Sequence, residues 1–292
     1  MIVSQIIGGL GNQMFQYATG RALSLARGQS LRLDISQFAA YGLHQGFDLQ
    51  RVFNPPIELA TESDVRAILG WQNSSAIRRI LSRPSMEAFR GKRFVVEPHF
   101  HYWQGIRDVP SDCYLVGHWQ SEKYFLQKAA QIRSDFAFRS APEGHNAELA
   151  RQIDSVNAVS VHVRRGDYAD NPQTNATHGL CSLEYYQAAI QYVAGRTGYP
   201  HLFIFSDDVE WSRKNLKFTF PCHYVDHNRG AESYNDMRLM SLCQHHIIAN
   251  SSFSWWGAWL DPKPTKIVVV PLKWFARKSD TTDLIPGGWI VL

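Results

Sequence analysis

Two adjacent arginines, Arg164 and Arg165, stand at the end of a segment whose pattern predicts a buried strand. Within residues 158–163, valines alternate with smaller or polar side chains, which is typical of a strand inside a sheet. Ligands of open α/β sheets bind beyond the carboxyl ends of the strands, and a guanidinium group matches phosphate oxygens through two parallel hydrogen bonds. Gly166 allows a tight turn or a close backbone approach there. The segment therefore predicts a ligand that carries a phosphate or a diphosphate.

The same arginines have a plainer interpretation, in which they form surface ion pairs with Asp167 as one partner. Exposed ion pairs are frequent and contribute little to stability. Because a strand and a glycine flank the arginines, we favour the ligand site, with Asp167 fixing one guanidinium while the other faces the ligand.

Residues 250–254, Asn-Ser-Ser-Phe-Ser, form a second polar segment, between an expected short strand at 247–249 and an expected helix. Unpaired backbone N–H groups at the start of a helix attract anions, and nearby hydroxyl groups can bind them too. Capping the helix requires one serine, whereas this segment has three, so we expect an anion cradle made of Ser251, Ser252 and Ser254. The tryptophans of the helix are expected in the core instead: Trp255, Trp256 and Trp259.

A third segment, residues 8–13, Gly-Gly-Leu-Gly-Asn-Gln, joins an expected strand to an expected helix, and Asp34 follows about 20 residues later. This is the spacing of a dinucleotide-binding turn, except that the third glycine of the pattern falls on Met14. A methionine there blocks close helix packing, so we interpret the segment as a loop that a ligand approaches closely. Its ligand contacts are expected from Gly9, Gly11 and Asn12, with Gln13 as a further amide that can bind sugar hydroxyls or phosphate.

Metal-binding patterns are weak. Two pairs of histidines have spacings that occur in metal sites, but neither has a convincing third ligand: His223 with His227, and His99 with His101. Asp207 and Asp208 follow an expected strand at 201–205 and could hold a divalent ion. Since two arginines already supply positive charge for a phosphate, we expect no catalytic metal.

Strands and helices alternate along the chain, which predicts a parallel α/β sheet. The pattern is clear at both ends and irregular between about residues 38 and 138, where prolines interrupt short periodic pieces. Residues 139–146 are the best linker candidate, giving domains at 1–140 and 147–275 and a C-terminal tail at 276–292 that could pack back on the first domain. The expected strands are 2–7, 31–34, 158–163, 201–205, 247–249 and 266–270.

Composition indicates a globular protein. The 292 residues are 45% hydrophobic, and a net charge of +4 is too small to suggest nucleic-acid binding. A basic stretch at 78–93 is interpreted as a solvated face, with weak attraction to anionic lipid as a minor possibility. Four scattered cysteines favour a reducing compartment, and no apolar run approaches the roughly 20 residues of a membrane span. We expect a cytoplasmic protein with at most peripheral membrane association.

Four segments together make the chain resemble the alpha-1,2-fucosyltransferases of glycosyltransferase family 11: residues 8–18, 162–168, 178–179 and 250–257. They span nearly the whole chain in the family's order. The resemblance implies a GT-B-like pair of Rossmann-type α/β domains facing a cleft, the N-terminal one less regular. It also implies GDP-L-fucose as donor, a terminal galactose whose 2-hydroxyl receives the fucose, and inversion at the anomeric carbon without a metal or other cofactor.

Similarity to the alpha-1,6- and protein O-fucosyltransferases suggests that Arg164 and Arg165 engage the diphosphate. It places the remaining contacts as follows: His162 and Asp236 beside the guanine, and Ser251, Ser252 and the N–H of Phe253 on phosphate. We also expect the donor to contact Gly9, Gly11, Asn12 and Asp207.

The chain departs from the alpha-1,6 enzymes at Tyr168, where they carry a lysine, so their proposed proton relay cannot be transferred. The base that takes the proton of the galactose hydroxyl therefore remains open. His178 is our candidate, because it lies in the polar loop after the arginines beside Gly179 and histidine titrates near neutrality. A packing or backbone role for His178 is the alternative.

Two other classes of function stay open. An NAD(P)-dependent oxidoreductase would use Gly9, Gly11 and Asp34. Met14, which stands in place of the third glycine of the dinucleotide-binding pattern, argues against this function. A non-catalytic glycan-binding protein would explain nine tryptophans and twelve tyrosines, but not the two arginines at a strand end. NAD(P)H fluorescence separates the first from a glycosyltransferase, and titration with GDP separates the second.

Overall fold

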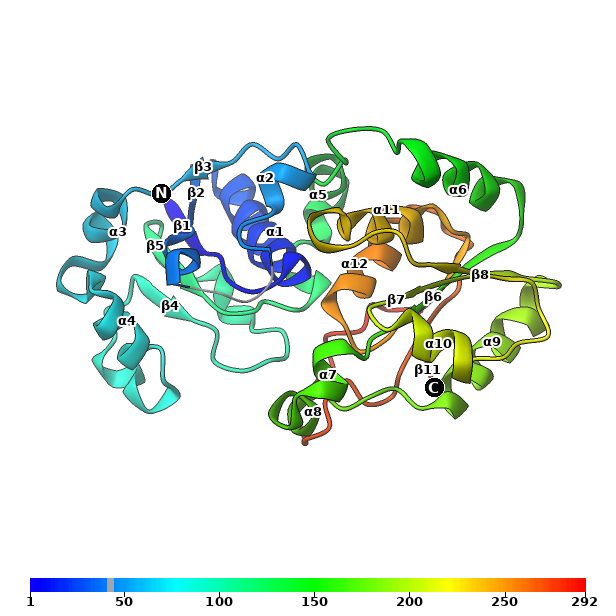
Figure 1. The fold of residues 1–292 in the computed structure, drawn as a ribbon. Coiled ribbons are helices and arrows are strands. Elements are labelled where there is room, and N and C mark those ends of the chain that lie inside the picture. The colour runs from blue at the N-terminus through cyan, green and yellow to red at the C-terminus, as the bar shows by residue number, and fades with distance from the viewer. Residues whose placement is uncertain (41–44) are drawn as a thin grey trace. The chain divides into compact units, whose positions relative to one another are not determined.

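The computed structural model describes residues 1–40 and 45–292, and it leaves the side chains of Ala40, Asp167 and Asp170 undescribed. The chain divides into two compact units, each built on its own parallel sheet (Figure 1). Unit 1 comprises Met1–Arg139 with Asp280–Leu284, and unit 2 comprises Ser140–Ser279 with Ile285–Leu292. No helix within the described residues is long and apolar enough to cross a membrane.

Unit 1 has a five-stranded sheet in the order β3-β2-β1-β5-β4, with every pair parallel. Its strands are β1 (Ile2–Gln5), β2 (Leu31–Asp34), β3 (Glu58–Leu59), β4 (Phe94–Val96) and β5 (Cys113–Val116). Its α-helices are α1 (Leu10–Arg27), α2 (Leu49–Val52), α3 (Glu62–Leu69), α4 (Ser75–Leu81) and α5 (Ala129–Asp135). Its 3-10 turns are η1 (Ser36–Ala40), η2 (Gly70–Asn73), η3 (Pro84–Phe89), η4 (Gln104–Arg107), η5 (Glu122–Tyr124) and η6 (Leu126–Lys128).

The first β-α-β unit forms as the sequence predicts. β1 is fully buried at the centre of the sheet, and α1 ends at Gly28, which adopts the left-handed backbone (φ 63°) that glycine tolerates. Asp34 at the end of β2 is buried and pairs with Arg78 (2.6 Å) and Tyr114. A carboxylate held this way has no access to a ribose, so the oxidoreductase alternative loses its acidic residue.

Unit 2 has a six-stranded parallel sheet in the order β11-β10-β9-β6-β7-β8. Its strands are β6 (Ala158–Val163), β7 (His201–Ser206), β8 (Cys222–Val225), β9 (His245–Ile247), β10 (Val268–Val270) and β11 (Ile290–Val291). Its helices are α6 (Gly144–Ser155), α7 (Gly166–Asp170), α8 (Pro172–His178), α9 (Leu183–Thr197), α10 (Val209–Asn215), η7 (Gly230–Glu232), α11 (Tyr234–Leu242) and α12 (Ser252–Leu260). The C-terminal residues thus add a strand to this sheet.

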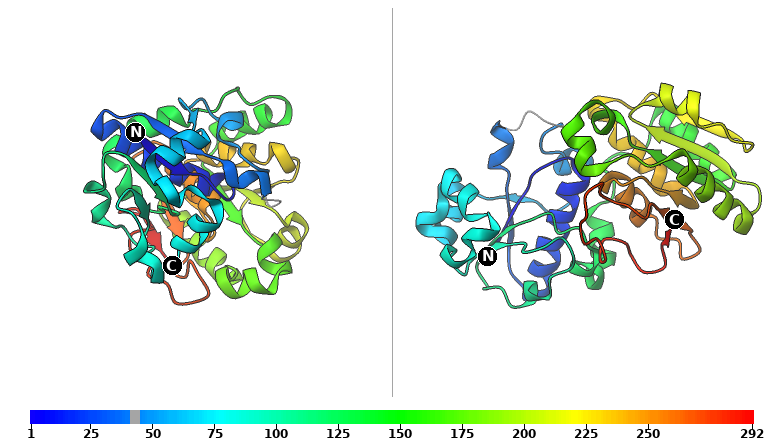
Figure 2. Two further views of the ribbon diagram at one scale, coloured as in Figure 1. Left: turned by 90° about the vertical axis from the view of Figure 1, so that its left-hand side faces the viewer. Right: turned by 90° about the horizontal axis from the view of Figure 1, so that it is seen from below.

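Helices cover both faces of the unit 2 sheet, as the views in Figures 1 and 2 show. The valines of β6 pack with α9 on one face, while Ala158, Phe203 and Phe205 pack with α6 and α11 on the other. Because side chains alternate along a strand, Ser160 and His162 share the face of Ala158. The sequence pattern of β6 therefore sets which helices surround His162.

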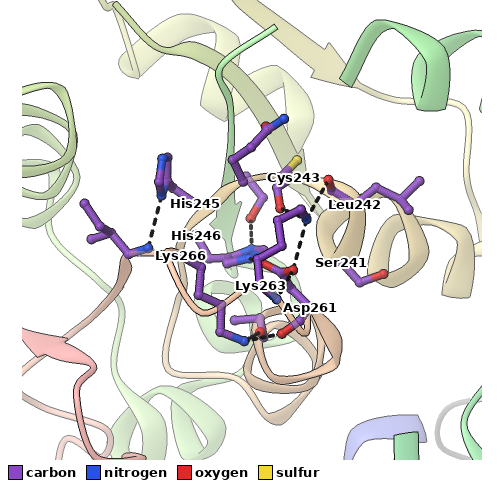
Figure 3. A network of polar contacts seen from close by, with 12 residues as sticks. Ser241, Leu242, Cys243, His245, His246, Asp261, Lys263 and Lys266 are labelled. Atoms are coloured by element: carbon purple, nitrogen blue, oxygen red, sulfur yellow. Dashed lines mark hydrogen bonds and ion pairs between the residues drawn. The ribbon is translucent and has the colours of Figure 1, made fainter. Parts of the chain in front are cut away.

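The strand expected at 247–249 is instead β9, two residues earlier, and it includes the buried His245 and His246. His246 lies between Ser160 Oγ (2.9 Å from Nδ1) and Asp261 Oδ2 (3.0 Å from Nε2), as part of the polar network in Figure 3. Burial lowers the pKa of His246 to about 4, so the ring is neutral near pH 7. Hydrogen bonds with Ser160 and Asp261 allow the polar His246 to be buried inside the strand. The sequence pattern, which follows apolar residues, therefore predicts a strand that begins too late.

Candidate functional site

The two arginines at the end of β6 pair with two aspartates at the end of the neighbouring strand β7. The register aligns Val163 with Ser206, so the next residues of each strand face one another. Arg164 Nη1 lies 2.8 Å from Asp207 Oδ2, and Arg165 Nε lies 3.5 Å from Asp208 Oδ2. The backbone N–H of Arg165 also donates to Asp207 Oδ1 (2.8 Å). The aspartates therefore fix both guanidinium groups at the strand ends.

The two oxygens of Asp207 contact Arg164 and the backbone N–H of Arg165, and the expected contact of Asp207 with the donor stays a prediction. The side chain of Asp167, the partner expected from the sequence, lies outside the described residues. A Cβ on Gly166 would lie 2.7 Å from Asp207 Oδ2, so a larger residue there would displace the carboxylate that pairs with Arg164. Arg165 also stacks over Trp211, with its guanidinium carbon 3.7 Å from the ring centroid.

His162 stands two residues before the arginines on β6 and is buried. Burial, and then the charge of Arg164, lower its pKa to about 3, so the ring is neutral. Its Nδ1 is buried and has no hydrogen-bond partner among the described residues. A buried polar atom without a partner is rare and is expected where a ligand supplies the partner. The ring lies 6.0 Å from that of Phe253, which connects β6 to the start of α12.

The start of α12 follows β9, the other neighbour of β6 in the sheet. Ser251 caps the helix by accepting from the N–H of Phe253 (3.3 Å), and Ser252 is the first helical residue. Ser254 is fully buried and donates to Ser251 O (3.3 Å), so the structure removes it from the expected anion cradle. The core position of the tryptophans is confirmed by their exposures of 0%, 0% and 2%: Trp255, Trp256 and Trp259.

Asp236 lies in the first turn of α11, a helix that packs on α12. Its Oδ1 accepts from Asn228 Nδ2 (2.8 Å). Asn228 in turn exchanges hydrogen bonds with Asn146 (2.9 and 3.0 Å), which fixes the orientation of both amides. Burial raises the pKa of Asp236 to about 7 against the opposing hydrogen bond from Asn228. The carboxyl group is therefore oriented and sensitive to pH near neutrality.

His178 is the last residue of α8, and its ring stacks on Tyr168 with centroids 4.6 Å apart. The guanidinium carbon of Arg164 lies over the same Tyr168 ring, 5.2 Å from its centroid. The carbonyl of His178 accepts from Asn250 Nδ2 (2.9 Å), which ties α8 to the loop before α12. The structure thus gives His178 packing and backbone contacts, and its role as a base stays a prediction.

Gly9, Gly11 and Asn12 belong to unit 1, whereas the other expected donor contacts belong to unit 2. Gly9 is the N-cap of α1, with an extended backbone, and Asn12 Oδ1 accepts from Gln120 Nε2 (2.8 Å). Gln13 is fully buried and bonds three backbone groups, donating to Gly8 O and Gly46 O and accepting from the N–H of Asp48. The expectation that Gln13 binds a ligand is therefore wrong.

The histidine pairs have other partners within the described residues. His227 Nε2 lies 2.8 Å from Asn146 Oδ1, and its ring stacks on His145. His99 and His101 stack on each other. In residues 1–40 and 45–292, no three His, Cys, Asp or Glu side chains come together as metal ligands.

Sequence reasoning missed Asp208 and Trp211 as partners of Arg165, and Asn228 as the partner of Asp236. A signal for Asp208 is present in the sequence: two arginines after one strand and two aspartates after the next imply pairing if the strands are parallel neighbours. No local signal marks Asn228, which comes from the loop after β8.

Comparisons with known proteins agree with this architecture. The family model "Glycosyl transferase family 11" matches residues 73–291. The chain is 36% identical to an Alpha-1,2-colitosyltransferase of Escherichia coli, over 99% of this chain and 98% of that one. It is 33% identical to the O-antigen biosynthesis glycosyltransferase WbnK of Escherichia coli, over 99% of both chains.

Among solved structures, fucosyltransferase NodZ from Bradyrhizobium matches with a TM-score of 0.56 at 17% identity, covering 89% of this chain and 92% of that one. The likeness confirms the predicted α/β, GT-B-like fold class, in which each unit carries a parallel sheet. A match across three quarters of the chain, together with relatives above 30% identity along its whole length, establishes the family. The chain belongs to glycosyltransferase family 11.

Proposed function

We propose that the protein is an inverting glycosyltransferase that moves L-fucose from GDP-β-L-fucose to the 2-hydroxyl of a terminal galactose. The observation that carries the proposal is the arrangement of unit 2, where Arg164 and Arg165 end β6 and the Ser251-capped helix begins after the adjacent strand β9. Two guanidinium groups and a helix start form a site for a diphosphate. NodZ, which shares the fold, has been studied after soaking with GDP-fucose.

In the proposed reaction, the acceptor oxygen forms a bond to C1 of fucose on the face opposite the diphosphate, and its proton passes to a general base, for which His178 is the candidate. The bond from C1 to the diphosphate oxygen breaks, and GDP leaves with the electron pair, which inverts the anomeric carbon. Negative charge grows on the diphosphate as this bond breaks, so the arginines and the α12 start stabilise the transition state more than the ground state. GDP is a good leaving group, so its departure requires no general acid.

His162 and Asp236 are proposed to hold the guanine. The unpartnered Nδ1 of the neutral His162 can accept a hydrogen bond, and the Asp236 carboxylate can accept from N1–H and the exocyclic amine of guanine. Adenine presents no such pair of donors at that edge, so this contact supports selection of GDP over ADP.

Colitose is a second candidate for the sugar that the protein transfers. The relative at 36% identity is named for transfer of colitose, which is fucose without its 3-hydroxyl. The test is to supply GDP-fucose and GDP-colitose with a panel of galactose-terminated saccharides and to determine the linkage of the product by NMR. A higher kcat/KM for GDP-fucose and an alpha-1,2 product are expected. A preference for GDP-colitose would identify the second candidate, and absence of glycosyl transfer from either donor would refute the proposal.

Transfer is expected to proceed in excess EDTA. Arg164, Arg165 and the α12 start already supply positive electrostatic potential to the diphosphate. The measurement is the initial rate with and without EDTA, followed by addition of Mg²⁺ or Mn²⁺. Loss of activity on chelation that either metal restores would contradict a metal-independent mechanism.

A further inference from the structure

A buried polar network in unit 2 holds the C-terminal end of α12 (Figure 3). Pro262 follows Asp261, and a residue before proline avoids the helical conformation, so Asp261 is extended (ψ 116°) and ends the helix. The Asp261 carboxylate is fully buried. His246 Nε2 (3.0 Å), Lys263 Nζ (3.0 Å) and the N–H of Lys263 (3.0 Å) contact its two oxygens. The end of the helix is thus held by β9 and by the segment that follows α12.

His246 connects this carboxylate to the centre of the sheet. Against the opposing effect of burial, hydrogen bonds and charge from His246 and Lys263 lower the pKa of Asp261, so the carboxylate is ionised. It only accepts hydrogen bonds, so His246 donates to it through Nε2 and accepts from Ser160 Oγ at Nδ1 (2.9 Å). The same residue types form the catalytic triad of serine hydrolases, but exposures of 2%, 0% and 0% here leave no access for a substrate. The three side chains therefore fix the end of α12 to β9 and to β6, the strand that carries His162.

Lys263 extends the network to the end of α11. Besides Asp261, its ammonium group donates to two carbonyls at the end of that helix, Leu242 O (3.3 Å) and Cys243 O (3.1 Å). Carbonyl groups at the C-terminal end of a helix lack partners within it and carry partial negative charge, so a cation is favourable there. One ammonium group thus bonds the C-terminal ends of both α11 and α12, as the dashed lines in Figure 3 show.

The two helices that share this lysine begin at the proposed donor contacts. Asp236 is in the first turn of α11, and Ser251 and Ser252 are at the start of α12. Between their ends the helices pack closely, since a Cβ on Gly257 of α12 would lie 3.0 Å from the Cβ of Met240 on α11. Each helix has nine residues, roughly 13 Å at 1.5 Å per residue, and such a hydrogen-bonded element moves as a rigid rod. The spacing of the two C-terminal ends therefore influences the spacing of the two starts.

We propose that Lys263 is a positioning residue, which sets the spacing between the guanine contact at the start of α11 and the phosphate contacts at the start of α12. The inference rests on the proposed function. GDP must occupy both places at once, and two places bind a linked ligand tightly only when their spacing matches it. Guanosine alone or pyrophosphate alone meets one helix, so its binding does not depend on the spacing. This difference separates a positioning role from a direct contact with the ligand.

The test is Lys263→Met, which removes the ammonium group but keeps an unbranched side chain at a position that is 38% exposed. GDP affinity, measured by calorimetry, is expected to fall about tenfold, because rigid linkage of two binding places contributes a factor of about 100 or more. Guanosine alone and inorganic pyrophosphate alone, measured by their competition with GDP-fucose, should bind as tightly as they bind to the wild type. The KM for GDP-fucose should rise with the loss of GDP affinity.

Two further variants separate positioning from a general loss of stability. Lys263→Arg keeps a cation with several N–H donors for the same acceptors, so it should recover most of the GDP affinity. Arg196→Met is the matched control, because Arg196 is a cation in the last turn of α9 whose bond to Tyr192 O (3.3 Å) stays within one helix. The thermal midpoint of each variant measures its loss of stability. A lower midpoint is allowed in both methionine variants, but only Lys263→Met should lose GDP affinity.

Unchanged GDP affinity in folded Lys263→Met would overturn the proposal. An equal loss of guanosine or pyrophosphate binding would also overturn it, because the lysine would then act on one helix or on the ligand itself, as would the same loss of GDP affinity in Arg196→Met. If Lys263→Met fails to fold, the neutral and shorter Lys263→Gln takes its place, and wild-type GDP affinity in that variant contradicts the link between the helices. A wild-type protein that binds no GDP would refute the proposed function and this inference with it, whereas the preceding outcomes refute the link alone.

Discussion

Replacing Arg164 or Arg165 with alanine is expected to lower kcat at least about a hundredfold, the scale for losing one donor that stabilises developing charge. Each guanidinium is fixed by an aspartate of the next strand, so it is oriented before the donor binds. Preorganised charge costs no reorganisation when the bond to the diphosphate breaks. The rate of transfer at saturating donor and acceptor measures the effect.

Two variants separate this role from loss of a positive charge or of packing. Arg165→Lys keeps the charge but loses the fork and its stacking on Trp211, so it should recover only part of the activity. Arg213→Ala is the matched control, because Arg213 also pairs with an aspartate (Asp226, 2.8 Å) and lies over a ring (Tyr224, 4.9 Å). Near-normal kcat in the folded double variant of Arg164 and Arg165 would show that the diphosphate binds elsewhere.

The pairing of these arginines shows which features the sequence predicts and which it does not: it predicts the strand and the cations, but not their partners. The strand, the two cations and the glycine are local features, and the structure confirms the strand at its predicted bounds. Their partners Asp207 and Asp208 come about 40 residues later, and which strand lies beside β6 depends on the order of the sheet. From the sequence alone, the nearer Asp167 is therefore the expected partner.

The strands of unit 1 are harder to predict from the sequence for a related reason. β4 and β5 are only three and four residues long, and prolines and loops separate them from the other elements, so no periodic pattern marks them. Yet β5 lies beside β1 in the sheet, and Glu97 owes its place to β4. A glutamate in an irregular segment has no local signal. Only the folded chain brings its carboxylate to the N–H groups of His118 and Trp119, from which it accepts hydrogen bonds.

Changing Asp236 to asparagine is expected to weaken GDP binding roughly ten- to a hundredfold, because hydrogen bonds to a charged group are worth about 1.5–3 kcal/mol. Asn228 occupies Oδ1 from one side, so the carboxylate is oriented for the base. The variant should also lose preference for GDP over ADP. Calorimetric titration with both nucleotides measures this, and Asp226→Asn, at an aspartate of the same unit paired with Arg213, is the control.

The pH dependence makes this prediction sharper, because the pKa of Asp236 is raised to about 7. Guanine donates two hydrogens to this edge, so the wild type needs the ionised form, and its GDP affinity should fall as the pH drops below about 7. Asparagine does not titrate, so the variant should show no such fall. An affinity that is unchanged by the substitution across this range would leave Asp236 with the role of a helix-start residue alone.

As the pH rises, Asp236 should lower the free energy of unfolding of the ligand-free protein, whereas it should raise the affinity for GDP. In the ligand-free protein the raised pKa means that the folded chain binds the Asp236 proton more tightly than the unfolded chain, whose value is near 3.8. Between about pH 4 and 7 this group therefore lowers the free energy of unfolding as the pH rises, and above that range the full cost of its buried charge remains. Asp236→Asn removes the cost, so its thermal midpoint without ligand should exceed that of the wild type at about pH 8. A residue that only capped α11 would lose stability on the same change, so a midpoint below the wild type would favour the capping role.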